Sequence, residues 1–259
     1  MSEAYRVRAD FPLILVYHGV SRGLPRGRYE IRVSTLERQL EALLNRGFTP
    51  LSLDDAVQML EGGAPRVPRC FTLTFDDGLG SFADNAIPVL ERLGLLGAVT
   101  VFVVTAYCGL RNGWPGGEET ERCMGWDEVK GLSMMGVRIA SHGHGHLDLR
   151  GLPYDEVVDD VKTSTRLLNE HAIRSRYFSF PFGFFSDSAK EAVREAGYEV
   201  AFGVETGGRD EREIRRIPLY RGDGPFLFRL KTCGAYFPIR DPIARIFGRD
   251  GKAEKSGRS

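Results

Sequence analysis

The chain has few cysteines and no excess of charge of either sign. Its cysteines lie far apart in 259 residues and none forms a CxxC pair, so we read them as free thiols in a reducing cytoplasm; they are Cys70, Cys108, Cys123 and Cys233. Lysine plus arginine number 35, as do aspartate plus glutamate. This balance excludes an electrostatic argument for a nucleic-acid partner or an anionic membrane surface.

Long apolar runs are also absent. No hydrophobic segment has the roughly 20 residues that a helix needs to cross a bilayer, and residues 1–10 are polar. The apolar run at 13–16 is too short for the core of a signal peptide. We therefore expect a cytoplasmic chain without a membrane span, and the sequence predicts no particular oligomeric state.

Strand and helix patterns alternate along the chain. Residues 98–104 are rich in β-branched side chains and apolar on both faces, which is typical of a parallel strand covered by helices. Further strands are expected at 13–18, 70–75, 137–140, 177–180 and 199–202, and helices at 34–45, 52–60, 82–93, 126–135, 154–171 and 187–196. This alternation predicts an α/β fold, a distorted (β/α) barrel with about seven parallel strands. We expect a single domain over 1–247 and a disordered tail over 248–259.

Two adjacent aspartates stand at the end of one predicted strand. The hydrophobic run at 70–75 leads directly into Asp76, Asp77 and Gly78. Neighbouring side chains on a strand point to opposite faces, but the sharp turn that Gly78 permits would let both carboxylates border one pocket. One carboxylate can then hold a metal ion while the other accepts a proton from water.

Three of the five histidines fall within the segment HGHGH at 142–146. In a strand, all three imidazoles would share one face and form a His-rich zinc site. The interleaved glycines disfavour both strand and helix, so a loop after the preceding strand is the preferred interpretation. In a loop, His142 and His146 could converge on one ion with Asp77, leaving a coordination position open as catalytic zinc sites do. The alternative is a polar surface loop that binds adventitious metal.

These residues resemble the motifs of the polysaccharide deacetylases (the NodB-homology domain), metal-dependent carbohydrate esterases that remove acetyl groups from N-acetylated sugars. The stretch TFDDG at 74–78 stands at the first motif of that family, and SHGHGH at 141–146 stands at the second. The turn FPFG at 180–183 is similar to the proline–aromatic–glycine turn of the third motif. The resemblance extends over about residues 11–218.

The resemblance implies a role for each matching residue. Asp76 would be the general base, and Asp77, His142 and His146 would be the metal ligands. The backbone N–H of Phe182 would donate a hydrogen bond to the oxyanion, aided by the metal. The implied metal is Zn²⁺, with Co²⁺, Ni²⁺ or Fe²⁺ as alternatives, because histidine and carboxylate suit several of these ions.

Substrate contacts are predicted at two places. The turn of Pro181, Phe182 and Gly183 would border the sugar, and Trp114 lies in a glycine-rich loop from which it could face the substrate. The resemblance implies an acetylated sugar or glycan precursor as the partner. A cytoplasmic location favours a precursor that is linked to a lipid or a nucleotide.

The chain departs from the family pattern at the arginine that supports the catalytic aspartate. In much of the family this arginine stands at the position of Ser179. Arg216, in the sequence IRRIP at 214–218, is the candidate replacement, because a nearby cation would keep Asp76 ionised. An ordinary solvated edge is the alternative interpretation of this cluster.

A second departure concerns the general acid. The family order usually ends with a strand that carries Leu-x-His, but no histidine follows His171 here. The apolar strand at 13–18 ends in His18 and resembles a branch of the family in which this last strand has moved to the front. His18 would then protonate the leaving amine, since the first and last strands of a barrel are neighbours. The alternative is a structural histidine at a strand end.

Together these features predict a hydrolase of linear amide bonds that removes the N-acetyl group of an acetamido sugar and releases acetate. Two alternatives stay open. A hydrolase of cyclic amides or ureido compounds shares this fold, and a non-catalytic glycan-binding protein would account for the departures at Ser179 and His18. The intact carboxylate pair and its two histidines favour the deacetylase.

Overall fold

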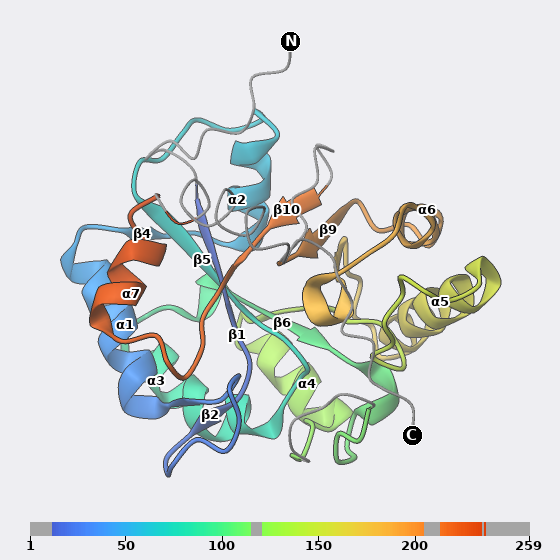
Figure 1. The fold of residues 1–259 in the computed structure, drawn as a ribbon, viewed down its shortest axis with the longest axis horizontal. Coiled ribbons are helices and arrows are strands. Elements are labelled where there is room, and N and C mark those ends of the chain that lie inside the picture. Colours follow the sequence, from blue (N-terminus) through green and yellow to red (C-terminus); the bar gives the residue numbers. More distant parts are fainter. Residues whose placement is uncertain (1–11, 115–120, 205–212, 235, 237–259) are drawn as a thin grey trace, which may run out of the picture.

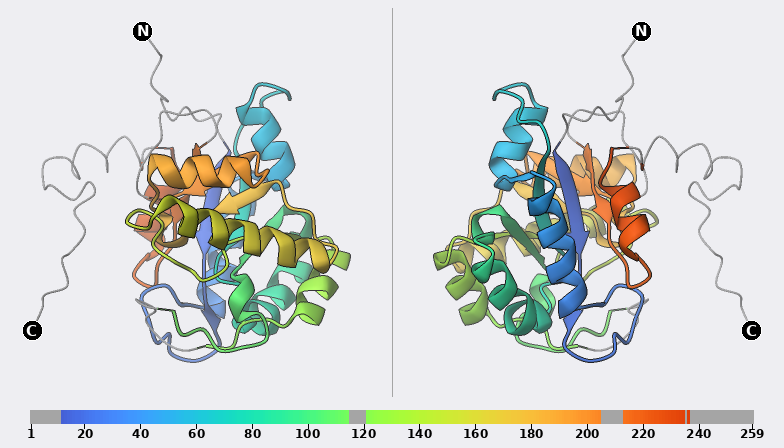
Figure 2. Two further views of the ribbon diagram at one scale, coloured as in Figure 1. Left: turned by 90° about the vertical axis from the view of Figure 1, so that its right-hand side faces the viewer. Right: turned by 90° about the vertical axis from the view of Figure 1, so that its left-hand side faces the viewer.

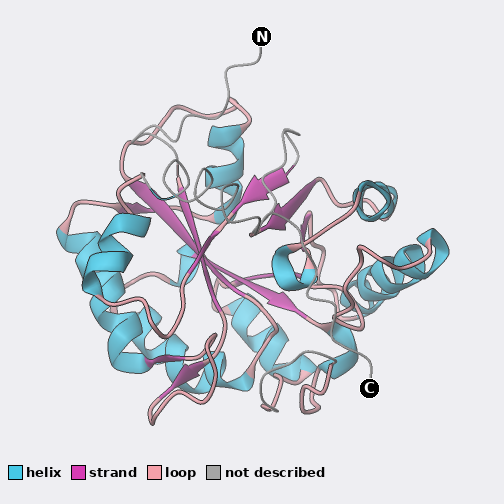
Figure 3. Ribbon diagram, in the orientation of Figure 1, coloured by secondary structure: helices cyan, strands magenta, loops and turns pink. Residues whose placement is uncertain are grey.

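The fold is a barrel of parallel strands surrounded by helices (Figures 1 and 3). The computed structural model describes residues 12–114, 121–204, 213–234 and 236. The main sheet has the order β10-β9-β8-β7-β6-β5-β1-β11, with β4 beside β5, and every pairing in it is parallel. Its strands are β1 (Leu13–Tyr17), β4 (Thr49–Pro50), β5 (Cys70–Phe75), β6 (Val99–Val103), β7 (Arg138–Ser141), β8 (Tyr177–Ser179), β9 (Val200–Gly203), β10 (Glu213–Arg215) and β11 (Ile217–Pro218). The predicted distorted (β/α) barrel is confirmed, with three short strands more than the pattern showed, namely β4, β10 and β11.

One extended segment joins the two ends of the sheet. β10 pairs with β9, whereas β11, which one residue separates from β10, pairs with β1. Arg216 stands between them, and its N–H donates to the carbonyl of Gly203 (3.0 Å). Just beyond β11, the N–H of Leu219 donates to the carbonyl of Val16 (3.0 Å). The first and last strands of the barrel are therefore neighbours.

Helices pack on the outside of the barrel in Figure 2. They are α1 (Val33–Asn45), α2 (Leu53–Leu60), α3 (Ile87–Arg92), α4 (Trp126–Met134), α5 (Tyr154–Glu170), α6 (Asp187–Glu195) and α7 (Pro225–Lys231), with short turns η1 (Phe82–Ala86), η2 (Leu96–Ala98), η3 (Thr105–Tyr107) and η4 (Pro181–Gly183). A separate small sheet pairs β2 (Val20–Ser21) with β3 (Ile31–Arg32). Leu53 and Val57 of α2 join the buried cluster that includes Phe102 and Phe202 of the barrel strands.

The helix predicted over 82–93 is interrupted. The π-turn η1 precedes α3, and Pro88 lies in the first turn of α3. Proline has no N–H to donate to the preceding turn, so a continuous α-helix cannot run through this position without losing a bond.

Other predictions concern the cysteines, the membrane and the ends of the chain. All four cysteines are free thiols, as predicted. Within the described ranges, no helix combines the length and the apolar character that a bilayer crossing requires. The proposed tail over 248–259 lies outside the described residues.

Candidate active site

One cavity lies at the carboxyl ends of the barrel strands and has a volume of about 440 Å³, within the range of small-molecule sites. Residues that follow different parallel strands meet at this face, as in other (β/α) barrels. The predicted site residues that line it are His18, Asp76, Asp77, Trp114, His142, His146, Phe182 and Gly183. The two remaining ones, Pro181 and Arg216, are buried and do not line it.

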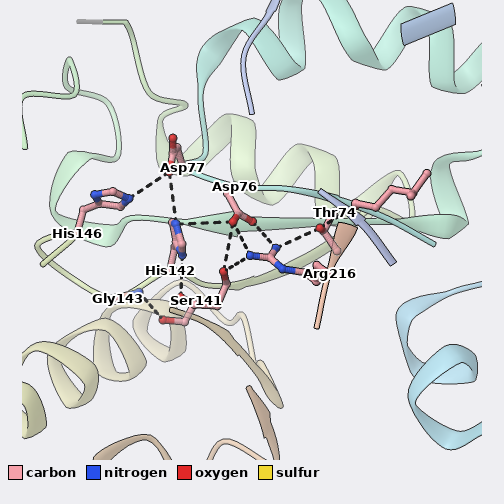
Figure 4. A network of polar contacts seen from close by, with 10 residues as sticks. Thr74, Asp76, Asp77, Ser141, His142, Gly143, His146 and Arg216 are labelled. Carbon is pink, nitrogen blue, oxygen red and sulfur yellow. Dashed lines mark hydrogen bonds and ion pairs between the residues drawn. The ribbon is translucent and has the colours of Figure 1, made fainter. Parts of the chain in front are cut away.

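The two aspartates diverge from a single turn. The N–H of Asp76 donates to the carbonyl of Tyr17 (3.0 Å), which extends the pairing of β5 with β1 by one residue. Asp77 and Gly78 then adopt left-handed conformations, with φ of +73° and +65°. As a result Asp76 faces Arg216 while Asp77 faces the two histidines (Figure 4). Both carboxylates thus border one site.

Asp77, His142 and His146 form a cluster that fits a metal ion. Oδ1 of Asp77 lies 3.4 Å from Nε2 of each histidine, and the three ligand atoms lie within 4.8 Å of one another. Donors bound to a tetrahedral zinc stand about 3.3–3.6 Å apart. This Oδ1 is buried and accepts no hydrogen bond from the described residues. A buried oxygen without a donor, facing two imidazole nitrogens, suits a cation.

The charges of this cluster depend on one another. Burial alone would raise the pKa of Asp77, but the contacts with His142 and His146 hold it well below its usual value. Burial would lower the pKa of His142, yet Asp76 and Asp77 raise it overall. A cation that binds here therefore takes the place of a proton.

The two histidines are oriented by different means. Nδ1 of His142 lies 2.7 Å from the carbonyl oxygen of Ser179, so the ring donates there and turns Nε2 toward Asp77. Nδ1 of His146 is buried without a hydrogen bond among the described residues. Its ring instead contacts the rings of Trp114 and Phe182, whose centroids lie 4.3 and 4.7 Å away.

The HGHGH segment lies beyond β7 and forms a loop, as preferred from its glycines. His144 takes no part in the metal cluster, because its Nδ1 lies 3.0 Å from Oγ1 of Thr105. The strand alternative, with all three imidazoles on one face, is wrong. The left-handed φ of Gly143 (+79°) and of His146 (+53°) breaks the alternation of side chains that a strand would keep.

Arg216 holds Asp76 through two parallel hydrogen bonds. Its Nη1 and Nη2 each lie 2.7 Å from one carboxylate oxygen, and Nη2 also donates to Oγ of Ser179 (2.7 Å). The arginine side chain is fully buried. Ser179 is thus small enough to leave space for a guanidinium that comes from the closing segment of the barrel. The solvated-edge alternative for Arg216 is wrong.

The partnership with Arg216 keeps Asp76 ionised. Burial would raise the pKa of Asp76, but the charge of Arg216, followed by that of His142, holds it below its ordinary value. Asp76 is therefore an anion beside the metal-binding cluster while it remains outside that cluster. The two carboxylates thus have different partners, and their roles as ligand and base stay predictions from the sequence.

His18 borders the cavity, as do Phe182 and Gly183 of the 181–183 turn. His18 follows β1, is half-buried, and packs against Tyr29 with the two rings tilted by 43° and their centroids 4.8 Å apart. Phe182 is a non-glycine residue with φ of +61° and is 38% exposed. Gly183 also has a positive φ, and a Cβ there would lie 2.6 Å from the side chain of Val204. The turn therefore presents Phe182 at the cavity edge in a conformation that costs backbone strain.

Trp114 lies deeper than the sequence suggested. Its side chain is 6% exposed and packs against His146 and Tyr107. It lines the cavity mainly as a support for His146 and offers little surface to a sugar.

Sequence reasoning did not find the part of the cavity lining that Arg28, Tyr29 and Tyr220 form. There the guanidinium of Arg28 lies over the rings of Tyr29 and Tyr220, at 5.2 and 4.5 Å from their centroids. These residues come from loops and carry no periodic or motif signal, so only the folded chain brings them together.

Comparison with known proteins identifies the family of this chain. The sequence profile of the family described as polysaccharide deacetylase matches residues 63–201. The protein YxkH of Bacillus subtilis (strain 168), whose name describes it as a polysaccharide deacetylase, is 26% identical to this chain over 195 residues. The match covers 75% of this chain and 64% of YxkH. The Escherichia coli (strain K12) poly-β-1,6-N-acetyl-D-glucosamine N-deacetylase is 24% identical over 73% of this chain but only 33% of its own. The chain thus spans less than two thirds of these relatives.

Solved structures agree on the fold. The structure of IcaB from Ammonifex degensii superposes with a TM-score of 0.74 at 24% identity, covering 87% of this chain and 97% of that one. The Streptococcus pyogenes deacetylase PplD, solved in complex with acetate, has a TM-score of 0.72 at 19% identity, covering 85% and 97%. With the family profile matching more than half of the sequence, the chain belongs to the polysaccharide deacetylase family.

Proposed function

We propose that the chain is a metal-dependent deacetylase that hydrolyses the N-acetyl group of an acetamido sugar in a glycan or glycan precursor and releases acetate. The observation that carries this proposal is the pairing of two carboxylates with different partners. Asp77 faces His142 and His146, whereas Asp76 is held as an anion by Arg216. Amide hydrolysis needs both an electrophilic ion and a base for water, and this site offers a place for each.

The metal-binding role falls to Asp77, His142 and His146. A divalent ion held there, with Zn²⁺ the first candidate and Co²⁺, Ni²⁺ or Fe²⁺ also suited, would polarise the acetamide carbonyl and acidify water. Three protein ligands leave room for water and substrate, as in catalytic zinc sites.

The proton transfers fall to Asp76 and His18. Asp76 takes a proton from the attacking water, and the backbone N–H of Phe182 donates to the oxyanion that forms on the carbonyl oxygen. His18 gives a proton to the departing nitrogen, so that the C–N bond breaks to give acetate and a free amine on the sugar. Asp76 and His18 follow the neighbouring strands β5 and β1, which supports their action on the same bond.

The His18 role predicts a dependence on the leaving group. We expect His18→Gln to lower the rate with an N-acetylated sugar by about 10²- to 10⁴-fold, the usual contribution of a general acid. Acetate release from 4-nitrophenyl acetate should fall much less, because nitrophenolate leaves without a proton. Both rates are measured at saturating Zn²⁺. Equal losses with the two substrates would remove His18 from the role of acid.

The substrate proposal rests on the cavity and on the relatives. The E. coli relative carries the name of a poly-β-1,6-N-acetyl-D-glucosamine N-deacetylase, which supports an acetamido sugar as the substrate class. Phe182, Tyr29 and Tyr220 lie around the cavity, where aromatic faces can cover the apolar face of a sugar ring. A lipid- or nucleotide-linked carrier and a cytoplasmic location stay predictions from the sequence.

Acetate release from a panel of N-acetylated sugars, nucleotide sugars and short chitin oligomers tests the proposal. We expect release that a chelator abolishes and that added Zn²⁺ restores. The inactive reference is His146→Ala, which removes a proposed metal ligand and leaves the hydrogen bonds between Arg216 and Asp76 in place. No release by protein shown to hold metal would instead favour the cyclic-amide hydrolase, to be assayed with hydantoins, or a glycan-binding protein that binds sugar equally well after chelation.

A further inference from the structure

A buried carboxylate on α5 holds the loop that carries both histidines. Asp160 is 5% exposed, and its two oxygens accept from successive backbone N–H groups: Oδ2 from His144 (2.9 Å) and Oδ1 from Gly145 (2.6 Å). With both oxygens accepting from the backbone, Asp160 does not belong to the metal cluster. It nevertheless contacts the backbone midway between the two histidines.

The remaining backbone groups of the loop are also held. The N–H of His142 donates to the carbonyl of Val103 (2.9 Å), and that of Gly143 donates to Oγ of Ser141 (3.2 Å). Ser141 in turn bonds Ser164 of α5 (2.7 Å), one helical turn after Asp160. Asp160 therefore supplies the acceptors for two of the four backbone N–H groups from 142 to 145. These two hydrogen bonds are stronger than those to the Val103 carbonyl and the Ser141 hydroxyl, because their acceptor is a carboxylate.

The same carboxylate explains the glycines of the HGHGH segment. A Cβ on Gly143 would lie 2.8 Å from Oδ2 of Asp160, and a Cβ on Gly145 would lie 3.2 Å from Oδ1. Side chains at either position would push Asp160 away from the backbone. The glycines thus leave space for an anion that the metal cluster does not use.

We infer that Asp160 is a positioning residue for the metal site. It fixes the conformation of the 142–146 loop, in which Gly143 and His146 have positive φ. The imidazole nitrogens of His142 and His146 are therefore already placed to bind one ion when the protein is metal-free. Loss of this support would let the loop relax, and metal binding would then have to order it again. Partners of this kind typically contribute about 10- to 100-fold to metal affinity. The inference rests on the metal site of the proposed function.

The test measures metal affinity without substrate. Apoprotein prepared with a chelator is titrated with Zn²⁺ against a chromophoric competitor, and the visible spectrum of the Co²⁺ form is recorded. We expect Asp160→Asn to weaken Zn²⁺ binding at least about tenfold and to change the Co²⁺ spectrum, because the amide keeps one acceptor and turns an NH₂ toward a backbone donor. The matched control is Asp54→Asn, since Asp54 bonds Tyr177 and Arg138 at the other ends of β8 and β7.

A second pair of variants applies if Asp160→Asn does not fold. Gly145→Ala adds a methyl group against Oδ1 of Asp160 and against the side chain of Leu147, whereas Gly151→Ala, a few residues further on, meets nothing within 4 Å. We expect weaker Zn²⁺ binding in the first and wild-type binding in the second. Unchanged affinity and an unchanged Co²⁺ spectrum in the Asp160 or Gly145 variant would overturn the inference and leave the proposed function intact. Failure of the wild-type protein to bind metal would overturn both.

Discussion

Asp76→Asn is expected to lower the rate of acetate release by about 10²- to 10⁴-fold while the protein still binds one metal ion. The amide has the shape of the carboxylate and can still accept from Arg216, but it cannot take a proton from water. Metal binding should persist because the ligand carboxylate is Asp77, whose Oδ1 faces both histidines. On one preparation of the variant, a Zn²⁺ titration measures whether metal binding is retained, and acetate release measures how far the rate has fallen.

Asp77→Asn is the matched control, because it makes the same replacement of a carboxylate by an amide at the adjacent residue. We expect it to lose metal affinity first and activity as a consequence, with partial recovery of activity at high Zn²⁺. If Asp76→Asn kept its activity, or if the two variants behaved alike, the division between base and ligand would be wrong.

Arg216→Met is expected to produce the largest loss of stability. It removes both hydrogen bonds that Arg216 donates to the buried carboxylate of Asp76, and breaking a buried ion pair typically costs about 3–5 kcal/mol. Denaturant unfolding gives the free energy of unfolding directly. Activity should fall as well, since burial without Arg216 raises the pKa of Asp76 and reduces its ionised fraction.

The double variant Asp76→Asn with Arg216→Met separates the two effects of the arginine. We expect it to be more stable than the sum of the single losses predicts, because neither charge is left buried alone. Its activity should stay as low as that of Asp76→Asn. Additive stability losses would show that the pair is not coupled.

The residues of the proposed metal site and the proposed base could be predicted because their signals are local. Asp76 and Asp77 follow a buried strand and precede a glycine, and His142 and His146 stand close together after another strand. The carboxyl ends of parallel strands share one face, so the meeting of these two segments followed from the fold class. The longer strands could be predicted for the same reason, since each is an apolar run.

The residues that contact and position the site could not be predicted as firmly from the sequence. Arg216 is 140 positions from Asp76, and the strands on either side of it have only two or three residues, too few for a period to show. Asp160 lies on a helix whose polar residues look alike in the sequence, and only the packing of α5 against the loop singles it out. Trp114 was expected to face the substrate, yet it is buried against His146, and the sequence gives no sign that these two residues, 32 positions apart, meet.

The most direct measurement is the rate of acetate release during a Zn²⁺ titration of chelator-treated protein, with an N-acetylated sugar as substrate. If Asp77, His142 and His146 hold the one ion that the reaction needs, the rate rises in proportion to added Zn²⁺, levels off at one equivalent, and stays near zero for His146→Ala at the same ratio. A full rate before any metal is added, or an equal rate in His146→Ala, would contradict a metal-dependent deacetylase at this site.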